Sequence, residues 1–125
     1  MELEGIDHVA IAVRDVERAA QWYCDVLGFV HRYKDAWDGN PTFIGKGTTA
    51  LALFPVRGRS TSTSHPPIRM LHLAFRADRK NFLGAQEELK HRGIDFEFQD
   101  HEISHSIYFH DPDGHELEIT TYDLK

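Results

Sequence analysis

Hydrophobic and polar positions in the first half of the chain predict a strand, a helix and three further strands. IDHVAIAV at 6–13 alternates as a strand does, and apolar residues then recur at helical spacing from Val16 to Leu27. Asp15 before this helix is typical of an N-cap, and Gly28 after it is typical of a helix end. The remaining strands of this half are predicted at 29–33, 42–44 and 49–54.

The second half of the chain repeats this order. MLHLAFRA at 70–77 predicts a strand, and a weaker helical stripe follows from Asp78, a second N-cap candidate, to Gly93. The sequence DPDG at 111–114 predicts a tight turn that leads into the last strand. The other strands of this half are predicted at 94–98, 106–110 and 115–122.

The two halves align as an internal repeat. Setting His8 on His72 superimposes the first strands. Setting Phe43 on Phe109 superimposes the last two strands of each half without a gap. We therefore expect an α+β fold of two βαβββ modules packed about a pseudo-twofold axis, near which equivalent inward positions converge. The single expected domain spans 1–125, with modules at 5–55 and 68–125 and a Ser-, Thr- and Pro-rich linker at 56–67.

Composition narrows the class of protein. A chain of 125 residues with 41% hydrophobic residues is long enough for one packed core, which argues against global disorder. The net charge of −6 and the lack of a basic stretch argue against nucleic acid and anionic membranes as partners. One cysteine, Cys24, excludes an internal disulfide. With no membrane-length apolar run and no signal-like N-terminus, we expect a cytoplasmic protein.

Histidine is the residue type that suggests chemistry, because the chain has nine. His8 and His72 are equivalent in the repeat, and Glu118 lies on the last predicted strand. Each residue alone is more often structural or solvent-exposed, but together they predict a 2-His-1-carboxylate metal site, which leaves coordination positions open for substrate. Glu116 shares a strand face with Glu118. The repeat sets Glu118 on Ala52, and this alignment favours Glu118 as the ligand.

The chain resembles the vicinal oxygen chelate superfamily, which includes glyoxalase I, bleomycin resistance proteins, fosfomycin resistance thiol transferases and extradiol dioxygenases. The resemblance rests on IDHVAIAV followed by AAQWYCDVLGF, on MLHLAF, and on SIYFHDPDGHELEI. It implies a half-open mixed β-barrel with metal ligands at His8, His72 and Glu118. Glyoxalase I has a fourth ligand where this chain has Ala52, and a methyl group cannot coordinate a metal. The resemblance therefore argues against glyoxalase and epimerase activity.

Three ligands of this kind resemble those of extradiol dioxygenases and fosfomycin-modifying enzymes. The dioxygenase resemblance implies that Tyr108 orients a substrate hydroxyl. It also implies a histidine that acts as an acid–base group. The candidates are His65, His105 and His110, and His110 shares a strand face with Tyr108. We expect His31, His91 and His101 to be solvent-exposed. Fe²⁺ or Mn²⁺ is the favoured metal, with Ni²⁺, Co²⁺ and Zn²⁺ as alternatives.

Two other functions stay open at this point. Fosfomycin thiol transferases have a Thr at position 10 and a Lys and a Ser within 98–104, where this chain has Ala10, Phe98 and Glu102. A metal-free binder of the bleomycin-resistance type would suit a cationic ligand, given the net charge of −6. In every case the partner is a small molecule, and a homodimer is expected because small βαβββ units leave unpaired sheet edges. The sequence leaves open whether one chain or two supply the site.

Overall fold

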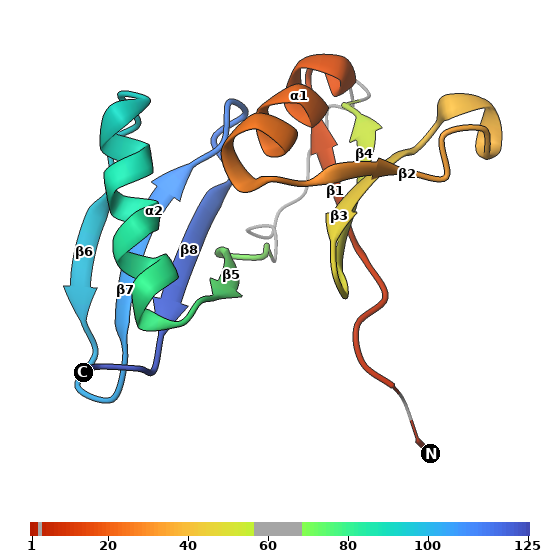
Figure 1. Ribbon diagram of the computed structural model, residues 1–125. Helices are drawn as coiled ribbons and strands as arrows, with labels where there is room; N and C mark the ends of the chain where they lie inside the picture. The colour runs from red at the N-terminus through yellow and green to blue at the C-terminus, as the bar shows by residue number, and fades with distance from the viewer. Residues whose placement is uncertain (3, 57–68) are drawn as a thin grey trace, which may run out of the picture. The chain divides into compact units, whose positions relative to one another are not determined.

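The computed structural model describes residues 1–2, 4–56 and 69–125. The chain divides into two compact units, Met1–Thr61 and Ser62–Lys125 (Figure 1). The predicted linker, apart from Val56, and its His65 lie outside the described residues. Neither helix of the described residues is long and apolar enough to cross a membrane.

The first unit has the predicted order of elements around a mixed sheet. The strands lie in the order β1-β4-β3-β2, with β1 parallel to β4 and the other neighbours antiparallel. A short 3₁₀ helix, η1, lies between β2 and β3. The elements are β1 (Val9–Val13), α1 (Val16–Leu27), β2 (Val30–Arg32), η1 (Trp37–Gly39), β3 (Thr42–Lys46) and β4 (Thr49–Pro55).

Helix α1 begins and ends where the sequence predicts. The Asp15 side chain accepts a hydrogen bond from the backbone N–H of Arg18, and Gly28 ends the helix with φ +72°. The helix packs on β3 and β4. Each large apolar side chain buried there contributes roughly 1.5–3 kcal/mol. The buried residues of this core include Ala19, Ala20, Tyr23, Ile44, Leu51 and Leu53.

The second unit has the same topology. Its strands lie in the order β5-β8-β7-β6, with β5 parallel to β8. The predicted cap is present, since Asp78 accepts from the N–H of Asn81 at 2.9 Å. This is the predicted α+β arrangement of two βαβββ units. The elements are β5 (Leu73–Arg76), α2 (Arg79–His91), β6 (Glu97–Asp100), β7 (His105–His110) and β8 (Glu116–Thr121).

Helix α2 covers one face of the second sheet (Figure 1). Ile107, Phe109 and Leu117 on that face are buried, as are Phe82 and Leu89 on the helix. The strand alternation turns Tyr108 and Glu118 to the opposite face. The sheet therefore has an apolar face under the helix and a polar face that is free to carry a site.

Strand pairing confirms one equivalence of the repeat alignment, Ala52 with Glu118, and corrects another, Phe43 with Phe109. Ala10 pairs with Ala52 in the first unit, and Ala74 pairs with Glu118 in the second, so Ala52 and Glu118 are equivalent as predicted. Phe43, however, pairs with Ala52, whereas Tyr108 pairs with Glu118. The residue equivalent to Phe43 is therefore Tyr108 rather than Phe109.

The difference arises in the two hairpin turns. The β3–β4 pairing closes at Lys46 and Thr49, around two turn residues. In the second unit the pairing continues to Asp111, whose N–H donates to the carbonyl of His115 across three turn residues. The second hairpin is thus one residue longer, and the ungapped alignment of the β3–β4 hairpin with the β7–β8 hairpin is wrong.

The first strand of each unit begins later than expected. The parallel ladders start at Val9 and at Leu73, so His8 and His72 each lie one residue before a strand. The two histidines keep equivalent positions, directly before the first strand of each unit.

Candidate functional site

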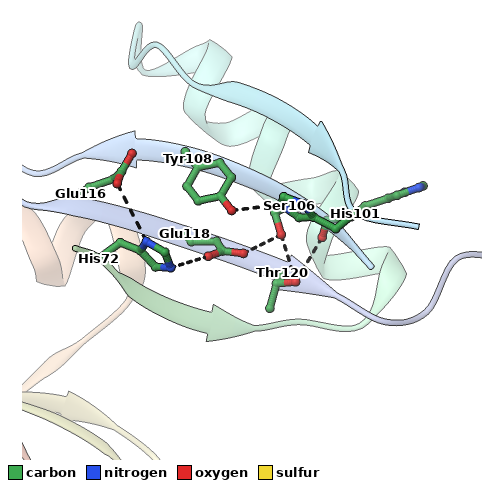
Figure 2. A network of polar contacts seen from close by, with 8 residues as sticks. His72, His101, Ser106, Tyr108, Glu116, Glu118 and Thr120 are labelled. Carbon is green, nitrogen blue, oxygen red and sulfur yellow. Dashed lines mark hydrogen bonds and ion pairs between the residues drawn. The ribbon is translucent and has the colours of Figure 1, made fainter. Parts of the chain in front are cut away.

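The polar face of the second sheet places His72 against Glu118. Nε2 of His72 lies 3.0 Å from Oε1 of Glu118 (Figure 2). Glu118 is 8% exposed, on a central strand of the sheet, whereas His72 is about one-third exposed. A buried carboxylate needs partners that satisfy its oxygens, and an imidazole nitrogen supplies one of them.

Ser106 holds the other oxygen of this carboxylate. The hydroxyl of Ser106 donates to Oε2 of Glu118 at 2.6 Å and also lies 3.1 Å from the hydroxyl of Thr120. The side chains of Ser106, Glu118 and Thr120 lie on the same face of the β7–β8 pair, as Figure 2 shows. Because Ser106 is fully buried, this contact fixes the direction in which Oε1 points.

Glu116 lies on the other side of the same imidazole. Its Oε2 is 3.9 Å from Nδ1 of His72, and its side chain is more exposed than that of Glu118. Of the two glutamates, Glu118 is the one within hydrogen-bonding distance of His72, and Glu116 faces the opposite nitrogen.

Tyr108 lies across the strand pair from Glu118. Its ring meets that of His72 edge to face, with centroids 5.8 Å apart. Burial raises the pKa of Tyr108, and the negative charge of Glu118 raises it further. The phenol therefore stays protonated at neutral pH and can donate a hydrogen bond.

His101 contacts the hydroxyl of Tyr108, although the sequence predicts it to be only a solvent-exposed loop residue. Its Nε2 lies 3.0 Å from the phenol oxygen. The loop between β6 and β7, closed by a hydrogen bond from the N–H of His101 to the carbonyl of Ser104, brings it there. No sequence motif marks this contact, since it depends on how the loop folds back.

The expected acid–base histidines have different surroundings. His105 shares the strand parity of Ile107, so it faces away from Tyr108; its ring meets Phe98, and its Nε2 lies 3.7 Å from Asp100. His110 is exposed at the end of β7, opposite Glu116, on the face that carries Tyr108. In contrast, His72 and His101 both contact Tyr108.

His8 belongs to the first unit and has a parallel environment there. Its Nδ1 lies 2.7 Å from Oδ2 of Asp7, and its ring meets Phe43 with centroids 5.0 Å apart. Phe43 pairs with Ala52, as Tyr108 pairs with Glu118. The first unit thus repeats the His–aromatic arrangement of the second, with a methyl group in place of the carboxylate.

Aromatic side chains surround Phe43. Trp37 and Tyr33 lie with ring centroids 5.2 and 5.6 Å from it, and both are more than half exposed. A hollow of about 340 Å³ in the same unit is lined by Tyr33 and Phe43 together with Asp7 and Arg32. The first unit therefore offers an exposed aromatic surface beside His8.

The donor chemistry of His72 and Glu118 fits a divalent metal. Two ligands at right angles on an ion with bonds of about 2.1 Å are about 3.0 Å apart, and this is the separation of Nε2 and Oε1. Within either unit, the described residues hold no group of three or more His, Cys, Asp or Glu side chains placed to bind an ion by themselves.

Comparisons with known proteins identify relatives along the whole chain. The family model described as "Glyoxalase/Bleomycin resistance protein/Dioxygenase superfamily" matches residues 5–119. The metallothiol transferase FosB of Staphylococcus epidermidis is 29% identical over 100% of this chain and 87% of that protein. Catechol-2,3-dioxygenase of Bacillus subtilis is 30% identical over 91% of this chain but only 40% of its own length.

A solved structure agrees with these sequence matches. The fosfomycin resistance protein FosX of Mesorhizobium loti is 26% identical and superimposes with a TM-score of 0.69 over 98% of this chain and 96% of that one. The comparisons confirm the resemblance that the sequence motifs indicate.

Proposed function

The chain belongs to the glyoxalase, bleomycin resistance protein and dioxygenase superfamily, and within it we propose that the protein is a metal-dependent enzyme acting on adjacent oxygens of a small aromatic substrate. The observation that carries this proposal is the 3.0 Å separation of Nε2 of His72 and Oε1 of Glu118. The two donors lie side by side on one sheet face, so both can bind the same ion. The third proposed ligand is His8, the repeat equivalent of His72.

The ligand set leaves room for a substrate. A divalent metal ion held by His8, His72 and Glu118 would act as a Lewis acid that binds vicinal oxygens and stabilises negative charge on them. Ser106 fixes the carboxylate of Glu118, so the ligand needs little reorganisation. We favour Fe²⁺ or Mn²⁺, because two imidazoles and a carboxylate are the ligands of a facial triad.

Tyr108 and His101 supply the protein's own proton chemistry in this proposal. The neutral phenol of Tyr108 donates its one hydrogen to a substrate oxygen, and His101, 3.0 Å away, donates to the phenol oxygen through Nε2–H. His110, on the same face, stays a proposed second acid–base group at its exposed edge. These roles need only side chains that already lie on the open face of β7 and the loop before it.

The aromatic surface beside His8 supports a planar substrate. Tyr33, Trp37 and Phe43 present rings that a further ring can stack against, each contact contributing about 0.5–1.5 kcal/mol beyond burial. The loop between β2 and β3 carries Tyr33 and Trp37, and it holds these two residues and Asp38 at φ of 55°, 56° and 52°. Such left-handed conformations are unfavourable for residues other than glycine and cluster at binding sites. The sharpest form of the proposal is therefore ring cleavage of a catechol-like compound.

A second candidate is thiol transfer to fosfomycin. The name of FosB, metallothiol transferase, supports the thiol transfer, and that of FosX, a fosfomycin resistance protein, supports the drug. This candidate is favoured by one observation: FosB matches this chain over nearly its whole length, whereas the dioxygenase match covers 40% of that protein. Against it, Ala10, Phe98 and Glu102 replace the polar and basic groups expected for an anionic phosphonate. Glu116 adds negative charge to the same face.

A parallel assay separates the two candidates. Protein loaded with Fe²⁺ without oxygen is mixed with a panel of catechols in air, and ring cleavage is followed by absorbance. Protein loaded with Mn²⁺ is given fosfomycin and a thiol, and the adduct is measured by mass spectrometry. Ring cleavage that is lost in His72→Ala but kept in the surface variant His91→Ala supports the first candidate. An adduct with no cleavage product replaces it with the second, and metal-free binding alone would indicate a sequestering protein.

The proposed metal site could take His8 from the same chain or from a second chain of a dimer. We propose a homodimer, since each sheet has two edge strands, β1 and β2 in one unit and β5 and β6 in the other. Mixing His8→Ala with His72→Ala chains reports the arrangement. If the ligands come from two chains, a mixed dimer regains one intact site. If they come from one chain, mixing restores no metal binding.

A further inference from the structure

Both proposed histidine ligands present Nδ1 to a carboxylate. Nδ1 of His8 lies 2.7 Å from Oδ2 of Asp7, and Nδ1 of His72 lies 3.9 Å from Oε2 of Glu116. We propose that Asp7 and Glu116 are positioning residues that accept the ring proton on Nδ1 when Nε2 of each histidine binds the metal. The inference rests on the proposed function.

The chemistry follows from how imidazole binds metals. A neutral ring carries one N–H, and the other nitrogen must offer its lone pair to the ion. A carboxylate at Nδ1 accepts that N–H, orients the ring and makes Nε2 a stronger donor. Asp7 meets this requirement directly, since 2.7 Å is the length of a charge-assisted hydrogen bond.

The two carboxylates are not copies of one another in the repeat. With His8 set on His72, Asp7 falls on Leu71. With Ala52 set on Glu118, Glu116 falls on Ala50. Each unit therefore carries its own carboxylate, one from the residue before the histidine and one from the neighbouring strand. Two unrelated positions that supply the same group to equivalent nitrogens point to a shared chemical requirement.

The two histidines differ in what metal binding demands of them. His8 already has its Nδ1 paired with Asp7. His72 also lies 3.0 Å from Glu118 through Nε2, and without metal this contact is a hydrogen bond that needs the ring proton on Nε2. Metal at Nε2 takes the place of that proton, and the neutral ring then carries its proton on Nδ1, facing Glu116. No net proton is gained or lost in this exchange. His8 thus already carries its ring proton on Nδ1, whereas His72 changes tautomer when metal binds.

Nitrogen NMR tests this directly. In ¹⁵N-labelled protein stripped of metal with chelator, long-range ¹H–¹⁵N correlations assign the proton of each neutral ring. We expect the Nδ1–H form for His8 and the Nε2–H form for His72, with His72 changing to Nδ1–H when Zn²⁺, a diamagnetic probe, is added. Loss of the His8 preference in Asp7→Ala, with partial return in Asp7→Asn, identifies Asp7 as its cause.

Zn²⁺ affinity, measured by competition with a chromophoric chelator, is the second readout. Asp7→Ala and Glu116→Ala should each weaken binding about 10- to 100-fold, Glu116→Gln by less, and the exposed helix variant Glu87→Ala not at all. Wild-type binding with unchanged affinity in Asp7→Ala and Glu116→Ala, or an Nε2–H form of His8 in the metal-free protein, would overturn the inference while leaving the proposed metal site intact. A wild-type protein that binds no Zn²⁺ would instead refute the proposed function, and the inference with it.

Discussion

Nε2 of His72 and Oε1 of Glu118 lie 3.0 Å apart on the polar face of the second sheet, although 46 positions separate the two residues in the chain. The parallel pairing of β5 with β8 brings them together, because Ala74, two residues after His72, pairs with Glu118. Because His72 directly precedes β5, the register of β5 on β8 sets its place beside Glu118.

Ser106 should be needed to keep Glu118 in place. Ser106→Ala removes the donor to Oε2 of a buried carboxylate, at a cost of about 1–3 kcal/mol in the free energy of unfolding. Metal affinity should fall as well, because the carboxylate is no longer held toward His72. Urea unfolding and chelator competition measure the two effects. Ser104→Ala, a buried serine of the adjacent loop, serves as the control; equal losses in both variants would contradict a specific role for Ser106.

Tyr108 should act in turnover and not in metal binding. Tyr108→Phe removes the phenol donor but keeps the ring against His72, so we expect kcat to fall roughly 100-fold with metal affinity unchanged. Steady-state kinetics on the best substrate of the catechol panel give the first value, and Zn²⁺ competition gives the second. A variant with normal kcat would show that the phenol is structural.

The ionisation of Tyr108 has a predictable direction. Burial, followed by the charge of Glu118, raises the pKa of Tyr108 in the metal-free protein above its usual value near 10. The unfolded chain then loses the phenol proton at lower pH than the folded chain, so folding stability decreases as pH rises above about 10. Ultraviolet titration of wild type minus Tyr108→Phe isolates this group. Glu118→Gln should move the isolated midpoint downward, and an upward or absent movement would contradict the charge coupling.

His101 should affect turnover through its contact with the phenol of Tyr108. His101→Ala removes the 3.0 Å partner of the phenol, and we expect turnover to fall about tenfold with little change in stability, since His101 is exposed. The matched control is His105→Ala, a histidine of the same hairpin that faces away from Tyr108. Equal effects of the two substitutions would remove His101 from the site.

The aromatic surface should set substrate affinity. Trp37→Ala removes one of the rings around Phe43, and KM for an aromatic substrate should rise roughly two- to tenfold. Because Trp37 is more than half exposed, stability should change little. The comparison is Tyr122→Ala, an exposed tyrosine that packs on Arg76 in the other unit. An unchanged KM in Trp37→Ala would separate this surface from the substrate.

Much of the fold could be predicted from the sequence because local patterns determine it. Caps at Asp15 and Asp78 and apolar periodicity locate both helices, and the repeat of DHVAIAV in LHLAFRA gives the βαβββ order. The repeat also pairs Ala52 with Glu118, and strand register confirms that equivalence. These features depend on residues that are close in sequence or lie on one strand, where the spacing between residues determines which way each side chain points.

What the sequence could not predict depends on turns and loops. GKGT and DPDG are both typical of tight turns, so the sequence does not show that the second hairpin has one more residue. The repeat equivalent of Phe43 is therefore Tyr108 and not Phe109. His101 contacts Tyr108 because the β6–β7 loop folds back, which no periodicity encodes. The pairing of Glu116 with Nδ1 of His72 likewise needs side-chain geometry that spacing does not supply.

The most direct test of the metal site is metal content per chain. Wild-type protein purified without chelator, then loaded with Fe²⁺ or Mn²⁺ and dialysed, is compared by elemental analysis with His8→Ala, His72→Ala, Glu118→Ala and the control His91→Ala. We expect about one equivalent of metal per chain in wild type and in His91→Ala, and loss of the metal in each of the other three variants. A wild-type protein without metal, or a His8→Ala variant that keeps its full equivalent, would contradict the proposed metal site.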